Sequence, residues 1–191
     1  MRSICLFCGA AAGASPRFAE AARALVAELV ARNIGIVYGG GKVGLMGVVA
    51  ETVLDSGGRI AGVIPEHLFD GEVAFETLEE LHITRSMAQR KAKMAQLSDG
   101  FVALPGGLGT LEEFFEVLSW AQIGLHGKPC ALFNVEGYYD QLIAFLDHAV
   151  ERGFIVPRAR ALAVVESDPE SLVARLVDTT PAAFDRWQSS E

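Results

Sequence analysis

The chain has 191 residues, of which 51% are hydrophobic and 21% charged, and its formal net charge is −8 at pH 7. This length favours one well-cored domain, and the composition excludes a disordered chain. The acidic balance argues against nucleic-acid and anionic-membrane partners, although the N-terminus of a single helix can still bind one phosphate. Charged or turn-forming residues interrupt every stretch of about 18 residues, which argues against a membrane span.

The cysteines and histidines argue against a metal site. Three cysteines are an odd number without an extracellular framework, and they suit a reducing cytoplasm. Cys5 and Cys8 lie three positions apart in a predicted strand, so they face opposite sides and form a poor metal or disulfide pair. The four histidines show no ligand spacing with cysteines or acidic residues. We therefore expect a cytoplasmic protein without a bound metal.

Short apolar runs alternate along the chain with segments of helical periodicity. The runs are apolar throughout, as in parallel strands covered on both faces, and they predict strands at residues 3–8, 34–39, 59–65, 100–105, 128–134 and 161–166. Helical spacing of apolar residues predicts helices over residues 18–32, 45–54, 86–97, 111–123, 138–150 and 171–177. The stretch 65–83 is the least regular and is interpreted as a loop or lid. The alternation predicts an α/β fold, a single Rossmann-like doubly wound domain over residues 1–180 with a mostly parallel sheet, followed by a tail at 181–191.

Ligands in such sheets bind beyond the carboxyl ends of the strands, and one of these ends carries the sequence "GGGKVG" at residues 39–44. Its spacing fits the G-x-G-x-x-G loop of dinucleotide-binding proteins, and Glu66 lies near the position of the expected acidic residue. Tight turns and close helix packing explain the same glycines equally well. A nicotinamide-dependent oxidoreductase is disfavoured because the length leaves no room for a substrate domain. Gly40 and Gly41 of this loop are candidate substrate contacts.

A second strand end carries "PGGLGT" and differs in kind. Pro105 ends the strand, Gly106 and Gly107 allow close backbone approach, Gly109 begins the helix, and Thr110 adds a hydroxyl group. Free N–H groups together with the positive end of the helix dipole suit a phosphate monoester. No Lys-Ser/Thr pair follows, as it would in a Walker loop, which favours a nucleoside monophosphate or a sugar phosphate over ATP.

Charged residues flank this second loop on two predicted helices. Thr110 and Glu113 match a capping box, in which the glutamate accepts from the threonine N–H, and this structural interpretation is favoured for Glu113 on its own. Arg90 and Lys91 lie on the helix that precedes the strand, so they can reach the same strand ends. Solvated surface charge is the simpler interpretation of these two residues when each is taken alone.

The motifs in their order resemble the LOG (Lonely Guy) family of cytokinin riboside 5′-monophosphate phosphoribohydrolases, many of them labelled lysine decarboxylases. The paired motifs of the family are M-x-x-R-K and P-G-G-x-G-T-x-x-E, and here they read "MAQRK" and "PGGLGTLEE". The segments "CLFCG", "VYGGGKVGLMG", "WAQIGLHGKP" and "NVEGYYDQL" extend the resemblance over about residues 4–155.

The resemblance implies hydrolysis of the N-glycosidic bond of an N6-modified adenosine 5′-monophosphate, with AMP as an open alternative, to the free base and ribose 5-phosphate. It also implies a homodimer with its site near the subunit interface, and no redox cofactor or catalytic metal. By motif position, Arg90 and Glu113 match the catalytic pair of the family. The substrate contacts that the resemblance implies are Glu72, Lys91, Gly106, Gly107, Gly109, Thr110 and Ser119.

The chemistry expected of this pair is glycoside hydrolysis. Glu113 stabilises an oxocarbenium-like sugar or activates the attacking water, while Arg90 binds the phosphate or orients Glu113. The chain departs from the family at Ala88, where histidine is common, and in "CGAA" from Cys8, where "CGSS" is common. Nothing marks a lysine for pyridoxal phosphate, and Lys42 in its glycine loop is a poor candidate. A non-catalytic nucleotide carrier of the same superfamily remains the alternative, although it has no need of Arg90 and Glu113.

Overall fold

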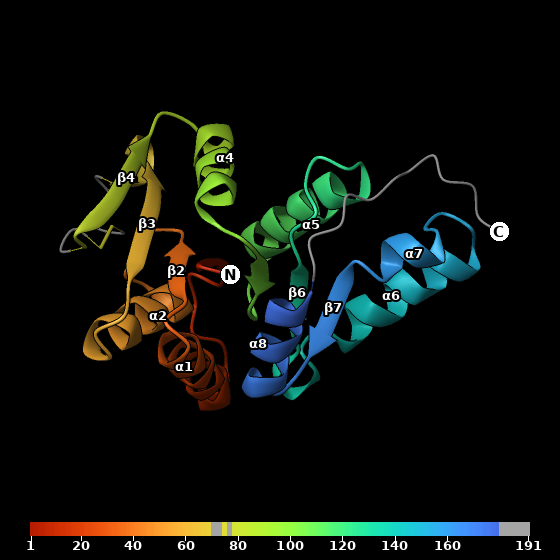
Figure 1. Cartoon of the computed structure of the whole chain (residues 1–191), viewed down its shortest axis with the longest axis horizontal. Coiled ribbons are helices and arrows are strands. Elements are labelled where there is room, and N and C mark those ends of the chain that lie inside the picture. The colour runs from red at the N-terminus through yellow and green to blue at the C-terminus, as the bar shows by residue number, and fades with distance from the viewer. Residues whose placement is uncertain (70–73, 76–77, 180–191) are drawn as a thin grey trace.

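The computed structural model describes residues 1–69, 74–75 and 78–179, and within them seven parallel strands form one sheet (Figure 1). The order of the strands across the sheet is β4-β3-β2-β1-β5-β6-β7. Their bounds are β1 (Ser3–Phe7), β2 (Gly35–Tyr38), β3 (Ile60–Pro65), β4 (Glu80–Thr84), β5 (Phe101–Ala103), β6 (Cys130–Phe133) and β7 (Ala163–Glu166). The predicted α/β fold with a doubly wound parallel sheet is confirmed. The predicted tail at 181–191 lies outside the described residues.

Helices cover both faces of the sheet. They are α1 (Pro16–Ala31), α2 (Gly44–Asp55), α3 (Glu66–Leu68), α4 (Met87–Leu97), α5 (Leu108–Gln122), α6 (Asp140–Glu151), α7 (Pro157–Arg160) and α8 (Pro169–Asp178), with a 3₁₀ turn η2 (Val135–Gly137) before α6. Buried side chains of α1, α2 and α8 pack with alternate strand residues such as Ile4 and Leu6, whereas those of α4 and α5 pack with Cys5 and Phe7. The predicted opposite orientation of Cys5 and Cys8 is confirmed, since the two thiols belong to different core clusters.

The order of the strands places a crevice at the centre of the sheet. From β1 the chain moves outward through β2, β3 and β4, and it then crosses to β5, β6 and β7 on the other side. The neighbours β1 and β5 therefore send their connecting loops to opposite faces, which opens a crevice at their carboxyl ends. Phe7 and Ala103 are the last paired residues of the two strands, so the loops that follow them border this crevice.

The start of α4 is fixed by a side-chain cap. The Ser86 hydroxyl accepts a hydrogen bond of 3.2 Å from the N–H of Gln89, and the N–H of Arg90 donates to the Ser86 carbonyl. Arg90 therefore lies at the end of the first turn of the helix, one turn above the loop that leaves β4. This position determines which strand ends its side chain can reach.

The stretch 65–83 is not a loop throughout, and this part of the prediction is wrong. Its last residues form β4, which pairs with β3 from Ala61 opposite Glu80 to Pro65 opposite Thr84. An edge strand is covered on fewer sides than a central one, so β4 carries exposed and half-buried residues in place of a continuous apolar run. A pattern of fully apolar runs therefore does not indicate this strand. No helix of the described residues is long and apolar enough to cross a membrane.

Candidate functional site

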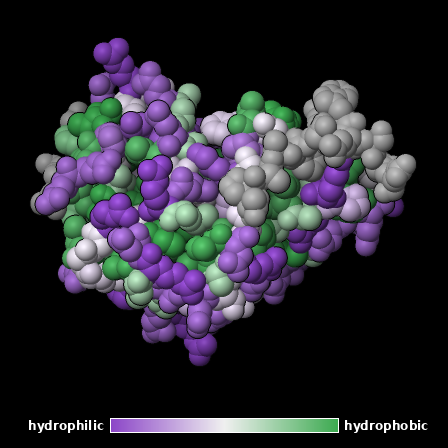
Figure 2. Space-filling model, viewed as in Figure 1, coloured by the Kyte–Doolittle hydropathy of each residue, from purple (hydrophilic) through white to green (hydrophobic). Residues whose placement is uncertain are grey.

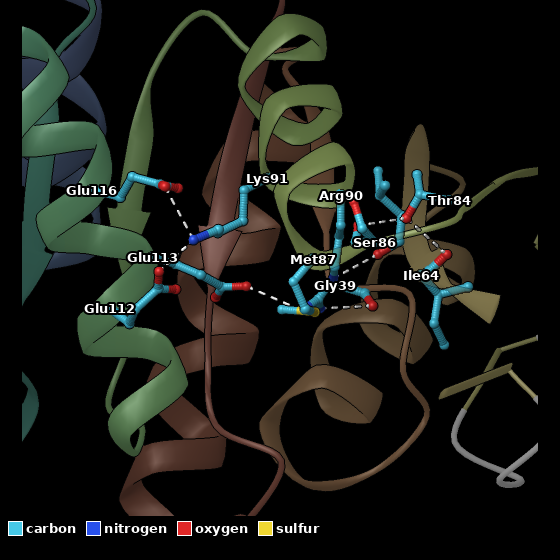
Figure 3. Close-up of polar contacts among 11 residues, drawn as sticks. Gly39, Ile64, Thr84, Ser86, Met87, Arg90, Lys91, Glu112, Glu113 and Glu116 are labelled. Atoms are coloured by element: carbon cyan, nitrogen blue, oxygen red, sulfur yellow. Dashed lines mark hydrogen bonds and ion pairs between the residues drawn. The ribbon is translucent and has the colours of Figure 1, made fainter. Parts of the chain in front are cut away.

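The Arg90 side chain is buried at the carboxyl ends of β2 and β3. Its Nε donates to the Val63 carbonyl at 3.0 Å, its Nη2 donates to the Gly39 carbonyl at 3.1 Å, and its Nη1 lies 3.2 Å from Oε1 of Glu113 (Figure 3). The Arg90 side chain is only 11% exposed, so its guanidinium needs such partners to offset its loss of hydration. The interpretation of Arg90 as solvated surface charge is therefore wrong.

Gly39 makes room for this guanidinium. A Cβ at Gly39 would lie 2.2 Å from Nη2 of Arg90, which no packed structure tolerates. Gly40, with a φ of 75°, accepts at its carbonyl from the N–H of Phe75 at 2.8 Å, and Gly41 forms a bridge with Ala74. These contacts give the "GGGKVG" loop a structural role around Arg90, in line with the packing interpretation. The substrate contacts of Gly40 and Gly41 stay a prediction.

Glu113 lies in the second turn of α5, and its side chain points to Arg90 (Figure 3). The helix begins at Leu108, three residues before the predicted range of 111–123, with Gly107 as its N-cap and no side-chain cap. Glu113 is thus too far along the helix to close a capping box with Thr110, and this interpretation is wrong. Burial raises the pKa of the Glu113 carboxyl, against the opposing charge of Arg90, and the neighbouring Glu112 raises it further. A carboxyl group with a raised pKa in a nearly dry site is suited to accept a proton.

The glycine loop before α5 offers hydrogen-bond donors without acceptors of its own chain. Within the described residues, the N–H groups of Leu108, Gly109 and Thr110 have no backbone acceptor, as expected for the first turn of a helix. An added Cβ at Gly107 or Gly109 would come within 4 Å of no other described atom. Packing therefore does not require glycine at these two positions, whereas close approach of a ligand would.

A cavity of about 390 Å³ lies at the predicted crevice, next to this loop. It is lined by residues 9–13 and 105–107 together with Phe18, Leu45 and Tyr138. The lining thus combines apolar side chains with two glycine-containing segments, and it includes Gly107, the N-cap of α5. Such a lining suits a ligand with a flat apolar body, whose anionic group could lie at the N-terminus of α5. An ion pair of one arginine and one glutamate lies at the neighbouring strand ends.

Comparison with known proteins shows the family of the chain. The family described as "Possible lysine decarboxylase" matches residues 46–176. "Cytokinin riboside 5'-monophosphate phosphoribohydrolase LOG1" of Arabidopsis thaliana is 50% identical over 180 residues, which cover 94% of this chain and 84% of that protein. "Probable cytokinin riboside 5'-monophosphate phosphoribohydrolase LOGL9" of Oryza sativa subsp. japonica is 53% identical over 180 residues, which cover 94% of this chain and 79% of that protein. The chain belongs to the LOG family.

Solved structures of low sequence identity share the fold of this LOG family member. The molybdenum cofactor carrier protein of Chlamydomonas reinhardtii has a TM-score of 0.67 at 20% identity and covers 92% of this chain and 98% of its own. The molybdenum cofactor binding protein of Rippkaea orientalis has a TM-score of 0.69 at 21% identity, and the match covers 93% of this chain and 96% of that protein. At this identity the likeness concerns the architecture of the chain alone.

Lys91, a predicted phosphate contact of the LOG motif, is held by carboxylates here. Its Nζ contacts Glu112 and lies 3.1 Å from Oε1 of Glu116, so it ties α4 to α5 (Figure 3). Burial alone lowers the pKa of the Lys91 ammonium, but the hydrogen bonds to the two glutamates outweigh this effect and raise it. Lys91 is therefore a cation at neutral pH and lies on the helix next to Arg90.

The other predicted contacts divide into three groups. Gly106 and Gly107 line the cavity and Thr110 is buried beside Gly106, in agreement with their placement at one site. The structure does not bring Ser119 to them, since α5 turns it toward a separate cavity of about 210 Å³ that Leu118 also lines. Glu72 lies outside the described residues. Among the described residues, no group of three or more His, Cys, Asp or Glu side chains could hold a metal ion.

Sequence reasoning missed two tyrosines that contact the glycine loop. Tyr138 donates to the Gly106 carbonyl and Tyr139 to the Leu104 carbonyl, each at 2.6 Å. Both follow β6 and belong to the segment "NVEGYYDQL", which carried the resemblance without any role for its residues. Two adjacent tyrosines just after a strand were the available signal, because a strand next to β5 directs the following turn toward the same crevice.

Proposed function

We propose that this chain hydrolyses the N-glycosidic bond of a cytokinin riboside 5′-monophosphate, an N6-modified adenosine 5′-monophosphate, to the free base and ribose 5-phosphate. The observation that carries the proposal is the buried Arg90–Glu113 pair beside a glycine loop of free N–H groups. Relatives of about 50% identity bear the name of this activity, which supports the same reaction here. AMP, which lacks only the N6 substituent, is the related substrate to compare.

The first step is the binding of the 5′-phosphate at the N-terminus of α5. Backbone N–H groups and the helix dipole favour an anion at this point despite the net negative charge of the chain. Glu113 lies five residues after Leu108, about 7 Å along the helix axis, and side chains of a helix lean toward its N-terminus. A ribose that hangs from the bound phosphate therefore extends toward the Glu113 carboxylate.

The second step is cleavage of the bond between C1′ and N9. As this bond breaks, its electron pair goes to N9 and positive charge develops on the sugar, which the Glu113 carboxylate stabilises. Water then bonds to C1′ and gives up a proton to a general base. The raised pKa of the Glu113 carboxyl suits the role of this proton acceptor. The departing base gains a proton, so the products balance as base and ribose 5-phosphate.

Arg90 acts in this scheme as a positioning residue. Three of its nitrogen atoms already have partners at Val63, Gly39 and Glu113, which supports orientation of the carboxylate over direct binding of the phosphate. The guanidinium also keeps a positive charge beside Glu113, which limits how far burial raises the pKa of that carboxyl. This choice between the two roles expected from the sequence is part of the proposal.

The decisive experiment is chromatography of the products formed from isopentenyl-AMP, AMP and isopentenyladenosine. Release of base from a monophosphate but not from the riboside is the expected result, and the Glu113→Gln variant serves as the inactive control. The ratio of rates for the two monophosphates then reports the preference for the N6 substituent. A folded protein that binds AMP but releases no base from any of the three would overturn the proposal in favour of the carrier alternative.

We also propose that two copies of the chain associate through exposed apolar residues just after the C-terminal end of α5. Ile123 and Leu125 are 50% and 68% exposed, and Figure 2 shows that hydrophobic residues reach the surface in several patches on the face in view. Ser119 lies on the same helix, so its predicted ligand contact would be with the site of a second copy. Light scattering after size-exclusion chromatography tests this assembly. A measured mass equal to that of one chain would contradict it.

The cytoplasmic location of the protein stays a prediction.

A further inference from the structure

The four carbonyl groups of residues 104–107, from the end of β5 to the N-cap of α5, all accept hydrogen bonds within the chain. The Leu104 carbonyl accepts from the Tyr139 hydroxyl, the Pro105 carbonyl from the N–H of Gly9 at 3.3 Å, and the Gly106 carbonyl from the Tyr138 hydroxyl. The Gly107 carbonyl accepts from the N–H of Leu111 as the first bond of α5. An approaching anion therefore meets backbone N–H groups, while the repelling oxygen atoms are turned to other donors.

The two tyrosines are held in place by the turn between β6 and α6. The N–H of Tyr139 donates to the Asn134 side chain at 2.7 Å, and the same side chain donates to Asp140 at 2.7 Å. Glu136 adopts a φ of 50°, which a residue other than glycine, asparagine or aspartate seldom takes. The hydrogen bonds of Asn134 offset the cost of this conformation. The turn places the rings of the two consecutive tyrosines next to each other.

The tyrosines differ in how much of their surroundings belongs to the cavity. Tyr139 is 1% exposed and lies in the core, with its ring at the base of the loop. Tyr138 is 45% exposed, lines the cavity, and meets the rings of Phe18 and Tyr139 edge to face. The hydroxyl of Tyr138 is thus the part of the pair that an isosteric change can remove without a hole in the core.

We infer that Tyr138 and Tyr139 act as positioning residues that hold the carbonyl groups of the glycine loop away from the bound phosphate. In this arrangement the Tyr138 hydroxyl donates to the carbonyl of Gly106, a residue that lines the cavity together with Tyr138 and precedes the N-cap of α5. Without that donor the carbonyl is free to turn toward the anion and repel it. The inference rests on the proposed function for the identity of the anion as a nucleoside 5′-monophosphate.

The experiment measures the binding of AMP and ribose 5-phosphate by titration calorimetry to the full chain and to its Tyr138→Phe variant. Phenylalanine keeps both ring contacts and removes only the donor, so we expect the dissociation constant for each phosphate to rise about fivefold to tenfold. The KM for the monophosphate is expected to rise by the same factor while kcat stays unchanged, because the contacts of Glu113 and Arg90 are not altered. A merely structural tyrosine would not separate KM from kcat in this way.

Tyr38→Phe is the matched control, since it removes the same hydroxyl group from another tyrosine. Tyr38 is fully buried in β2, and its hydroxyl has no hydrogen-bond partner among the described residues. Its loss is expected to leave the affinity for AMP unchanged. Thermal melting of both variants shows whether each remains folded.

The outcomes separate this inference from the proposed function. If the wild-type chain binds AMP but releases no base from isopentenyl-AMP, AMP or isopentenyladenosine, the hydrolase proposal fails, while a weaker affinity of Tyr138→Phe for AMP still supports the role of the tyrosines. If Tyr138→Phe binds AMP and ribose 5-phosphate as tightly as the wild type, the inference fails whatever the activity. A loss of affinity in Tyr38→Phe equal to that in Tyr138→Phe would also overturn it, because the effect would then have nothing to do with the loop.

Discussion

The guanidinium of Arg90 and the carboxylate of Glu113 form an ion pair between α4 and α5, with side chains that are only 11% and 10% exposed. Loss of one partner from a buried pair usually leaves a charge without compensation, at a cost of about 3–5 kcal/mol. Here the two partners are unequal. When Glu113 is removed, Arg90 still donates to two backbone carbonyls. When Arg90 is removed, no other cation among the described residues lies as close to the Glu113 carboxylate. The pair is therefore built around a fixed arginine that holds a carboxylate in place.

The Glu113→Gln substitution should separate activity from stability. The amide keeps the shape of the side chain and can still accept from Arg90, and burial already disfavours the carboxylate, so we expect a change in the free energy of unfolding within about 1 kcal/mol. The rate of base release should fall at least about a hundredfold, because the developing positive charge on the ribose loses its counter-charge. Urea unfolding and single-turnover kinetics measure the two quantities. Turnover at the wild-type rate would remove Glu113 from the reaction.

The Arg90→Lys substitution should damage both properties in spite of the conserved charge. An ammonium group cannot reach Val63, Gly39 and Glu113 with the flat, forked geometry of a guanidinium, so buried carbonyls lose their donors. We expect the free energy of unfolding to fall by about 2–3 kcal/mol and the rate of base release to fall with it. Arg32→Lys, an exposed change on α1 where the arginine pairs with Glu28, is the matched control and should alter neither. Equal behaviour of the two variants would contradict the positioning role of Arg90.

The Gly109→Ala substitution should stabilise the chain while it weakens substrate binding. An alanine Cβ at this helical position touches no described atom within 4 Å, and alanine is favoured over glycine in a helix, here by about 0.5 kcal/mol. The added methyl group occupies the space where the phosphate approaches, so the KM for the monophosphate should rise about tenfold or more. The reverse change on another helix, Ala144→Gly at an exposed position of α6, should lower stability without any effect on KM. An unchanged KM in Gly109→Ala would show that the phosphate binds elsewhere.

Most of the fold could be predicted from the sequence because its central strands are buried on both faces. Runs such as that around Ile36 are apolar throughout, and this pattern survives without any knowledge of their neighbours. The edge strand β4 was missed because its exposed side permits residues such as Glu80. The helix that was predicted from Tyr138 begins at Asp140, since the backbone turns at Glu136 and Gly137, and no residue type announces a φ of 50° at a glutamate.

The candidate site could be predicted in part, and the remainder depends on contacts between distant elements. The motif order pointed to Arg90 and Glu113, but the local pattern around Glu113 favoured a capping box, because the sequence does not reveal that the helix begins at Leu108. That Gly39 lies against Arg90 is a contact across 51 positions of the chain. Such a contact follows from the order of the strands in the sheet, which periodicity alone does not determine.

The pH dependence of the reaction should report the environment of Glu113. Burial raises the pKa of this carboxyl, with Arg90 opposing and Glu112 adding to the effect, so kcat/KM should fall as the pH drops through a pKa above the usual value for glutamate. The effect on folding has the opposite sign. Protonated Glu113 is favoured in the folded chain, so its contribution to stability is present below the unfolded pKa and is lost as the pH rises through the folded pKa.

Glu112→Gln tests this assignment without a change to the catalytic pair. The substitution removes a negative charge next to Glu113, and the pKa of Glu113 should therefore decrease, which moves the acid limb of the kcat/KM profile to lower pH. Glu20→Gln, an exposed change on α1 away from the site, is the control and should leave the limb in place. An acid limb that Glu112→Gln does not move would mean that a group other than Glu113 titrates in the free enzyme.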